Sequence, residues 1–317
     1  MSSSSFEKDV IAGLTAKEKH LSSKYLYDEV GSKIFEDIMR MPEYYLTDCE
    51  YEIFNTYQQE LLNCFFDTKE PFDLIELGAG DGYKTKILLE YFSKQDVPFE
   101  YDPIDISEKA VKHLVADIQK NYPSVSVKGL VGDYFQIIKE LNSRSTKRKV
   151  ILFLGSNIGN YQYTDALHFF NQLKNVMHKN DLLLIGFDLK KEPDIILKAY
   201  NDPHGHTAKF NLNLLNRINN AFNANFNLQQ YEHIEEYSPE TGTANSYLIS
   251  KSEQHVELRD LNFKVDFKEG ERIFMEISQK YDQAMIESLA KDSGFEVVRN
   301  FCDKRLYFTN SLWKLKS

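Results

Sequence analysis

The chain has 317 residues, 42% of them hydrophobic and 27% charged, with a mean hydropathy of −0.47. This composition is typical of a folded globular protein and excludes a mainly disordered one. The net charge of −10 argues against a nucleic-acid partner, because proteins that neutralise many phosphates normally carry excess positive charge. At this length, two domains are expected.

The sequence also argues against a membrane or secreted protein. No run approaches the roughly 20 apolar residues that a membrane-spanning helix needs, and the first twenty residues lack the pattern of a secretory signal. Cys49, Cys64 and Cys302 form no Cys-x-x-Cys pair, and a third ligand near His204 and His206 is missing. We therefore expect a cytoplasmic protein with reduced cysteines, no metal site and no membrane partner.

The first fifty residues are expected to be mostly helical. Ile34, Ile38 and Met41 recur at helical spacing, and Pro42 breaks the pattern. From residue 71, short apolar runs alternate with helical stretches such as 84–92 and 108–119. The runs predict five strands, at 71–77, 99–105, 125–133, 149–155 and 182–188. This alternation predicts an α/β fold with a Rossmann-like parallel sheet and helices on both faces.

After residue 188 the alternation stops. Residues 191–235 are expected to be helical, and period-two patterns predict strands at 245–251, 263–267 and 272–278. A helix at about 281–293 and strands at 295–301 and 305–313 would complete the sheet, with the last strand antiparallel. We therefore predict a sheet domain, 52–190 plus 280–317, and a second α+β domain, 1–51 plus 191–279.

Polar groups follow three successive predicted strands. Gly78 opens a Gly-x-Gly-x-Gly turn, while Tyr83 stands where a dinucleotide fingerprint would need its third glycine. Asp105 could accept hydrogen bonds from both hydroxyls of a ribose. Asp133 could accept from the exocyclic amine of a base, and the Tyr134 ring could lie beside that base. Because ligands bind at the carboxyl ends of parallel strands, this combination indicates a class I methyltransferase that uses S-adenosylmethionine (SAM).

The chain resembles a narrower family, the histidine-specific N-alpha-methyltransferases of ergothioneine biosynthesis. ELGAGDGYKT (76–85) is similar to the cofactor loop of that family, and FLGSNIGN (153–160) to its fourth-strand motif. Further segments carry the resemblance, at 24–47, 188–202, 210–215 and 275–281. Family members place three methyl groups on the alpha-amine of histidine, which gives hercynine. Their second domain is assembled from the N-terminus plus an insertion, as expected above.

The resemblance implies three sets of site residues. The cofactor contacts implied are Gly78, Lys84, Asp105, Asp133 and Tyr134. The contacts implied for the amino-acid substrate are Tyr44, Asn160, Tyr200, Glu276 and Ser278. Tyr27 and Gly155 are implied beside the reacting amine, as the catalytic positions.

The residues themselves support part of this assignment. Glu276 and Ser278 lie two apart on a predicted strand, so both would face one side, where a carboxylate and a hydroxyl can bind both imidazole nitrogens. Two positions depart from the family pattern. Residues 46–48 read Leu-Thr-Asp where Pro-Thr-Arg is usual, and Ser246 stands where a Met often lines the imidazole pocket. The smaller side chain would leave more room there.

The leading hypothesis is therefore a monomeric enzyme that transfers methyl groups from SAM to the alpha-amine of L-histidine, up to trimethylation. One alternative is methylation of another small-molecule amino acid or aromatic amine, such as tryptophan. Another is a non-catalytic SAM-binding regulator, but Asn160, Tyr200 and Glu276 are all present, whereas a regulator would be expected to have lost its substrate residues.

Overall fold

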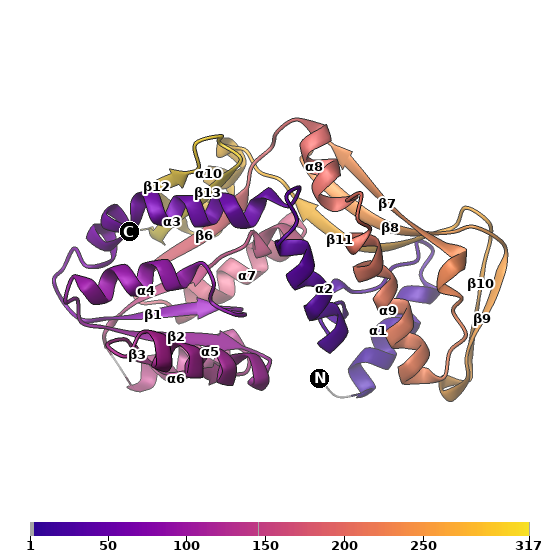
Figure 1. Cartoon of the computed structure of the whole chain (residues 1–317), viewed down its shortest axis with the longest axis horizontal. Coiled ribbons are helices and arrows are strands. Elements are labelled where there is room, and N and C mark those ends of the chain that lie inside the picture. Colours follow the sequence, from indigo (N-terminus) through magenta and orange to yellow (C-terminus); the bar gives the residue numbers. More distant parts are fainter. Residues whose placement is uncertain (1–2, 145, 317) are drawn as a thin grey trace. The chain divides into compact units, whose positions relative to one another are not determined.

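The computed structural model describes residues 3–144 and 146–316 (Figure 1). Contacts cluster into two compact units. The insertion unit comprises Met1–Tyr45 and Lys191–Ser278, and the sheet unit comprises Leu46–Lys190 and Gln279–Ser317. Within the described ranges, none of the helices has the length and apolar character needed to cross a bilayer.

The sheet unit is built on one mixed sheet with the strand order β12-β13-β6-β5-β1-β2-β3, and β4 also pairs with β2. Its strands are β1 Phe72–Leu77, β2 Phe99–Asp105, β3 Ser126–Val127, β4 Leu130–Val131, β5 Arg148–Phe153, β6 Leu182–Asp188, β12 Phe295–Cys302 and β13 Phe308–Leu315. Strands β1 to β6 pair in parallel, whereas β13 runs antiparallel to β6 and to β12. The predicted α/β class and the antiparallel last strand are thereby confirmed.

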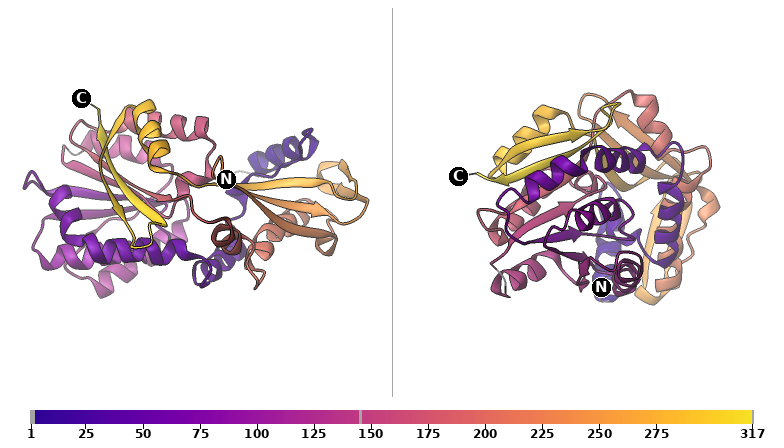
Figure 2. Two further views of the ribbon diagram at one scale, coloured as in Figure 1. Left: turned by 90° about the horizontal axis from the view of Figure 1, so that it is seen from above. Right: turned by 60° about the vertical axis from the view of Figure 1, so that its left-hand side comes forward.

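Helices lie on both faces of this sheet (Figures 1 and 2). They are α3 Tyr45–Phe65, α4 Thr85–Lys94, α5 Glu108–Asn121, α6 Tyr134–Arg144, α7 Tyr163–Val176 and α10 Gln283–Asp292, with a 3-10 turn η2 at Asn157–Asn160. On one face, α6, α7 and α10 pack on an apolar core that includes Ile75 and Ile151. On the other, Phe65 of α3 contacts Phe72 of β1 and Phe92 of α4. Since β1 and β6 are buried along their whole length, their sequences are continuously apolar apart from a few acids.

The prediction of one strand over 125–133 is wrong in detail, because this segment forms two strands of two residues each, β3 and β4, with a break between them. The break lies beside Pro103 of β2, which has no N–H to donate to the ladder, because Val127 pairs with Tyr101 and Leu130 with Ile104 on either side of it. A β-carbon at Gly129 would lie 2.4 Å from a methyl group of Val111 and 2.7 Å from one of Val115. Gly129 therefore lets the chain pass close to α5 at the break, and the ladder with β2 resumes in β4 in the same register.

The insertion unit combines helices with two small antiparallel sheets. Its helices are α1 Ser3–Thr15, α2 Glu29–Met39, α8 Pro193–Tyr200 and α9 His206–Phe222, with 3-10 turns η1 Ser23–Tyr25, η3 Leu228–Gln230 and η4 Arg259–Leu261. Its strands are β7 Tyr231–Ser238, β8 Thr243–Ser250, β9 Gln254–Leu258, β10 Phe263–Phe267 and β11 Arg272–Gln279. They form the sheets β11-β8-β7 and β10-β9.

The expectation of helix through residue 235 is wrong at its end. Helix α9 stops at Phe222, where Asn223 adopts a left-handed conformation (φ 48°), and β7 begins at Tyr231. Strand β7 buries Tyr231, His233 and Glu235 on one face. Because two of these three inward residues are polar, no hydrophobic alternation marks the strand.

Candidate active site

The glycine turn after β1 adopts the backbone conformation that its sequence requires. Gly78, Gly80 and Gly82 have φ values of 69°, 56° and 63°, a region that other residues rarely adopt. A β-carbon at Gly78 would lie 3.1 Å from the Tyr134 hydroxyl, and one at Gly82 would lie 2.8 Å from a Leu114 methyl group. The loop therefore brings its backbone close to neighbouring side chains at the carboxyl end of the sheet.

Glu76, the acidic residue next to the end of β1, holds the start of the glycine loop in place. Glu76 is buried and accepts hydrogen bonds from the Thr85 hydroxyl (2.8 Å) and from the Tyr101 hydroxyl. Burial raises the pKa of Glu76 to about 7, although both hydrogen bonds favour its charged form. Its carboxyl group therefore ties β1 to the first turn of α4 and to β2.

Asp105 is the last residue of β2, and Asp133 lies just after the neighbouring strand β4, at the same edge of the sheet. The Gly132 amide donates to the Asp105 carbonyl (3.1 Å), which holds the end of β4 beside the end of β2. The Asp105 carboxylate accepts from the Ser107 amide (2.8 Å), and that of Asp133 accepts from two amides at the start of α6. Burial, and then the Asp105 charge, raises the pKa of Tyr134 to about 12, so these predicted cofactor residues share one environment.

Glu50 is a residue that the sequence reasoning missed. It lies on α3, is fully buried, and accepts hydrogen bonds from the Lys84 ammonium and from the Gly155 amide (3.0 Å). A β-carbon at Gly186 would lie 2.6 Å from its carboxylate. The Glu50 carboxylate thus joins α3, the glycine loop after β1 and the turn after β5.

A sequence signal for Glu50 was present in α3. Leu46, Ile53 and Phe54 lie four before, three after and four after Glu50, and all three are buried. Glu50 is therefore a lone charge in an apolar helical stripe, where an unpaired charge would be strongly unfavourable.

Gly155 and Asn160, the predicted substrate-side positions of the sheet unit, frame the turn after β5. Gly155 has φ 72°, and Ser156 is also left-handed (φ 57°). The Ser156 hydroxyl accepts from the Asp188 amide (3.0 Å), and a β-carbon at Gly159 would lie 3.0 Å from the Gln279 carbonyl oxygen. Asn160 ends η2 and is partly exposed. The turn is thereby fixed between the ends of β5 and β6.

The five predicted residues of the insertion unit gather around its tyrosines. The Tyr44 and Tyr200 rings are 6.1 Å apart, and the Ser278 hydroxyl donates to that of Tyr200 (3.0 Å). Burial, then the Glu276 carboxylate and the two other tyrosines, raise the pKa of Tyr27 well above its usual value. The structure therefore brings these five residues together, from segments far apart in the sequence.

Aromatic packing positions this group. Phe35 of α2 and Phe210 of α9 both contact Tyr27 at ring distances of 5.3 Å, and Phe35 also contacts Tyr44. Tyr27 as a whole remains 43% exposed, although its hydroxyl lies among the other polar groups of this cluster. Because its pKa is raised, the Tyr27 hydroxyl keeps its proton at neutral pH.

Ser246 is engaged in a buried polar pair on the same unit. Its hydroxyl donates to the Glu235 carboxylate across the β7–β8 ladder, and the His233 ring lies 3.9 Å from the same carboxylate oxygen. Burial lowers the pKa of His233 to about 4, so this imidazole is neutral. The room expected beside the small Ser246 side chain is therefore bordered by a carboxylate.

The family described as "Histidine-specific methyltransferase, SAM-dependent" matches this chain from residue 6 to 315. The chain is 33% identical over 288 residues to a histidine N-alpha-methyltransferase of Mycolicibacterium smegmatis, covering 90% of this chain and 88% of that protein. It is 32% identical to a histidine N-alpha-methyltransferase of Mycobacterium tuberculosis, covering 96% and 93%. An L-tryptophan methyltransferase of Psilocybe serbica is a more distant relative, 25% identical, with 91% and 86% covered.

The family match spans nearly all of both units, including the glycine loop after β1 and strand β11. The resemblance and the SAM cofactor predicted from the sequence are thereby confirmed. On this match and on the identity to its relatives, the chain belongs to the SAM-dependent, histidine-specific methyltransferase family.

Proposed function

We propose that this methyltransferase transfers methyl groups from SAM to the alpha-amine of L-histidine, up to the trimethylated product hercynine. The observation that carries the proposal is the family match from residue 6 to 315. The grouping of Tyr27, Glu276 and Ser278 in the insertion unit supports it, because a carboxylate and a hydroxyl that lie together can bind both nitrogens of an imidazole.

The sheet unit is proposed to hold the cofactor. Gly78 keeps the loop free of a side chain, the Asp105 carboxylate would accept from ribose hydroxyls, and Asp133 would accept from the amine of the base. Tyr134 would lie against the base, and the Lys84 ammonium, fixed by Glu50, would pair with the carboxylate of the amino-acid end. The donor and acceptor types present fit each part of SAM.

When bound, SAM supplies an electrophilic methyl group. The chain must then present the alpha-amine of the substrate in its neutral form, with the lone pair directed at that carbon. The protonated Tyr27 hydroxyl can accept a hydrogen bond from the amine and so orient it without removing a proton. Positioning would therefore supply most of the rate, and Gly155 and Asn160 remain predictions as further contacts to the substrate.

Glu276 and Ser278 are proposed to read the side chain of the substrate. An ionised carboxylate accepts from one imidazole N–H, and the Ser278 hydroxyl, oriented by Tyr200, can interact with the other ring nitrogen. A site built to hydrogen-bond its substrate rejects analogues that lack the matching group, because its buried polar atoms would be left without partners.

The test is a mass-spectrometric screen of the purified protein with methyl-labelled SAM against each free amino acid. We expect histidine to gain up to three labelled methyl groups and to react fastest. Faster labelling of tryptophan would replace the substrate in the proposal. Tight SAM binding without transfer to any amino acid would favour a regulator.

A further inference from the structure

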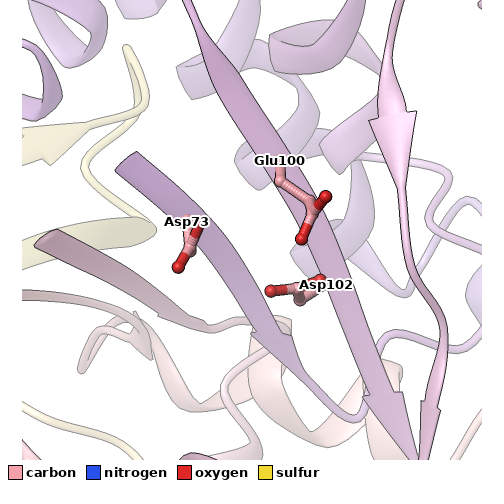
Figure 3. A group of neighbouring side chains, drawn as sticks. All are labelled: Asp73, Glu100 and Asp102. Atoms are coloured by element: carbon pink, nitrogen blue, oxygen red, sulfur yellow. The ribbon is translucent and has the colours of Figure 1, made fainter. Parts of the chain in front are cut away.

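Three acidic side chains meet on the sheet unit, at the opposite end of the strands from the glycine loop. Asp73 is the second residue of β1, and Glu100 and Asp102 are the second and fourth residues of β2. Asp73 and Glu100 are direct neighbours in the parallel ladder. Figure 3 shows the three carboxylates directed toward one another, and one oxygen from each lies within 4.8 Å of the others.

Asp102 is the member of this group that points to a ligand. It is 1% exposed, and neither of its carboxylate oxygens has a hydrogen-bond partner among the residues described. The strand alternation places it on the same face as Ile104, which belongs to the apolar core. A carboxylate buried in such a place without a partner is costly, unless a cation or a proton neutralises it.

The surrounding positive charge only partly compensates the group. Lys147 is 3.1 Å from the Asp73 carboxylate and is 47% exposed, while the Glu100 carboxylate accepts from the Ser126 hydroxyl (3.1 Å). Burial, and then the Glu100 and Asp73 charges, raise the pKa of Asp102 to about 7, although Lys128 and Lys147 lower it. Lys128 and Lys147 thus offer two positive charges to three carboxylates, and neither lysine hydrogen-bonds Asp102.

We propose that Asp73, Glu100 and Asp102 form a binding site for a hard divalent cation of the size of Ca²⁺. Carboxylate oxygens are the ligands that such ions prefer. Calcium binds oxygen at about 2.3–2.6 Å, so two ligands on opposite sides of one ion lie up to about 5.2 Å apart. The three oxygens all lie within 4.8 Å of one another, inside that limit. Mg²⁺ usually keeps several of its waters and is seldom held by an all-protein cage, so a group of three carboxylates with a buried member favours Ca²⁺.

The site would fasten the amino ends of the two central strands. Asp73 and Gly78 are separated by five residues, which correspond to about 16 Å along a strand. A cation bound there would therefore stabilise the sheet without touching the proposed cofactor residues. Its effect should be visible in stability and binding, independently of methyl transfer.

The experiment begins with protein stripped of metal by a chelator and titrated with Ca²⁺ by calorimetry, with Tb³⁺ luminescence as a second probe. We expect one ion per chain, and a rise in Tm of about 5–10 °C at a hundredfold excess over Kd. Asp102→Asn, which keeps the shape of the side chain, should lower the affinity at least about tenfold. Lys147→Met should raise the affinity, because it removes the cation that competes at Asp73.

Glu108→Gln is the matched control, since this acid lies on the same unit but is exposed and pairs with Lys112 (2.6 Å). It should bind Ca²⁺ like the unmodified protein. Absence of saturable binding up to millimolar Ca²⁺ would overturn the site, as would an equal affinity in Asp102→Asn with an unchanged circular dichroism spectrum. Tighter binding of Mg²⁺ than of Ca²⁺ would overturn the assignment of ion size.

Discussion

The two units place their candidate residues in different ways. In the sheet unit, Gly78 and Asp133 follow β1 and β4 and Asp105 ends β2, so the order of parallel strands brings them to one edge. In the insertion unit, Tyr27 and Tyr44 flank α2, Tyr200 ends α8, and Glu276 lies in β11. No repeating pattern connects those positions, and only packing brings them together.

This difference indicates how each site should respond to change. Backbone turns at the ends of the parallel strands fix the cofactor edge, that is, the edge of the sheet with Gly78, Asp105 and Asp133. Losing one side chain there should therefore weaken SAM binding while the other residues keep their positions. The insertion unit depends on a group of buried polar and aromatic side chains whose positions depend on one another. Changes there should alter substrate choice and pH response more than cofactor binding.

The largest effect is expected at Glu50, a buried side chain that holds the sheet unit together and so departs from this contrast. Glu50→Ala should reduce the free energy of unfolding by about 3–5 kcal/mol, because it leaves Lys84 without its partner and the Gly155 amide without its acceptor. Urea unfolding measures the loss. Glu52→Ala is the matched control on α3. Its carboxylate is 31% exposed, accepts from the Lys304 amide (3.2 Å) and lies 3.8 Å from the Lys304 ammonium, so its loss should cost less than about 1 kcal/mol.

The second prediction concerns the pH response of the insertion unit. The pKa of His233 falls to about 4 in the folded protein and is near 6.5 in the unfolded chain. The unfolded state therefore binds the proton first, and stability should fall as the pH drops from about 6.5 toward 4, by on the order of 2 kcal/mol. Glu235 and Asp202 are the charges that oppose this loss.

Thermal unfolding of His233→Gln beside the unmodified protein measures this effect. Between pH 7 and 4.5 the variant should lose less stability than the unmodified protein. Parallel pH curves for the two proteins would show that His233 does not contribute to the acid sensitivity.

The third prediction tests the cofactor edge. Asp105→Ala should weaken SAM binding by about 1–3 kcal/mol, the cost of leaving ligand hydroxyls unpaired, while the fold is retained. Calorimetric titration with SAM measures the change, and the exposed Glu108→Ala on the next helix is the control. Unchanged affinity in Asp105→Ala would remove this residue from the proposed cofactor site.

The smallest effect is expected for Glu276→Ala, which tests whether the insertion unit controls the choice of substrate. Glu276→Ala should lower kcat/KM for histidine at least about tenfold, because one imidazole N–H loses its charged acceptor. SAM affinity should stay nearly unchanged, and activity on tryptophan should fall less. Initial rates with both amino acids distinguish the roles, because an equal loss on both would show that Glu276 only supports the fold.

Sequence reasoning identified most of the sheet unit but not all of its buried chemistry. The runs at 71–77, 149–155 and 182–188 correspond to β1, β5 and β6, because fully buried parallel strands are continuously apolar. Residues 231–235 were expected to be helical, since His233 and Glu235 put polar groups on the buried face of β7. The prediction that no metal site exists considered only histidine and cysteine spacing, and Asp73, Glu100 and Asp102 become neighbours only through strand pairing.

By itself, the sequence determined the alternation of strands and helices, the glycine turn after β1 and the acids that follow β2 and β4. These are local properties, because apolar runs and left-handed turns leave a direct trace in residue type and spacing. Only the tertiary structure decided that Glu50 holds Lys84, that Glu235 accepts from Ser246, and that Asp102 has two buried oxygens beside two other acids. Those contacts join residues that are distant along the chain, and no local periodicity encodes them.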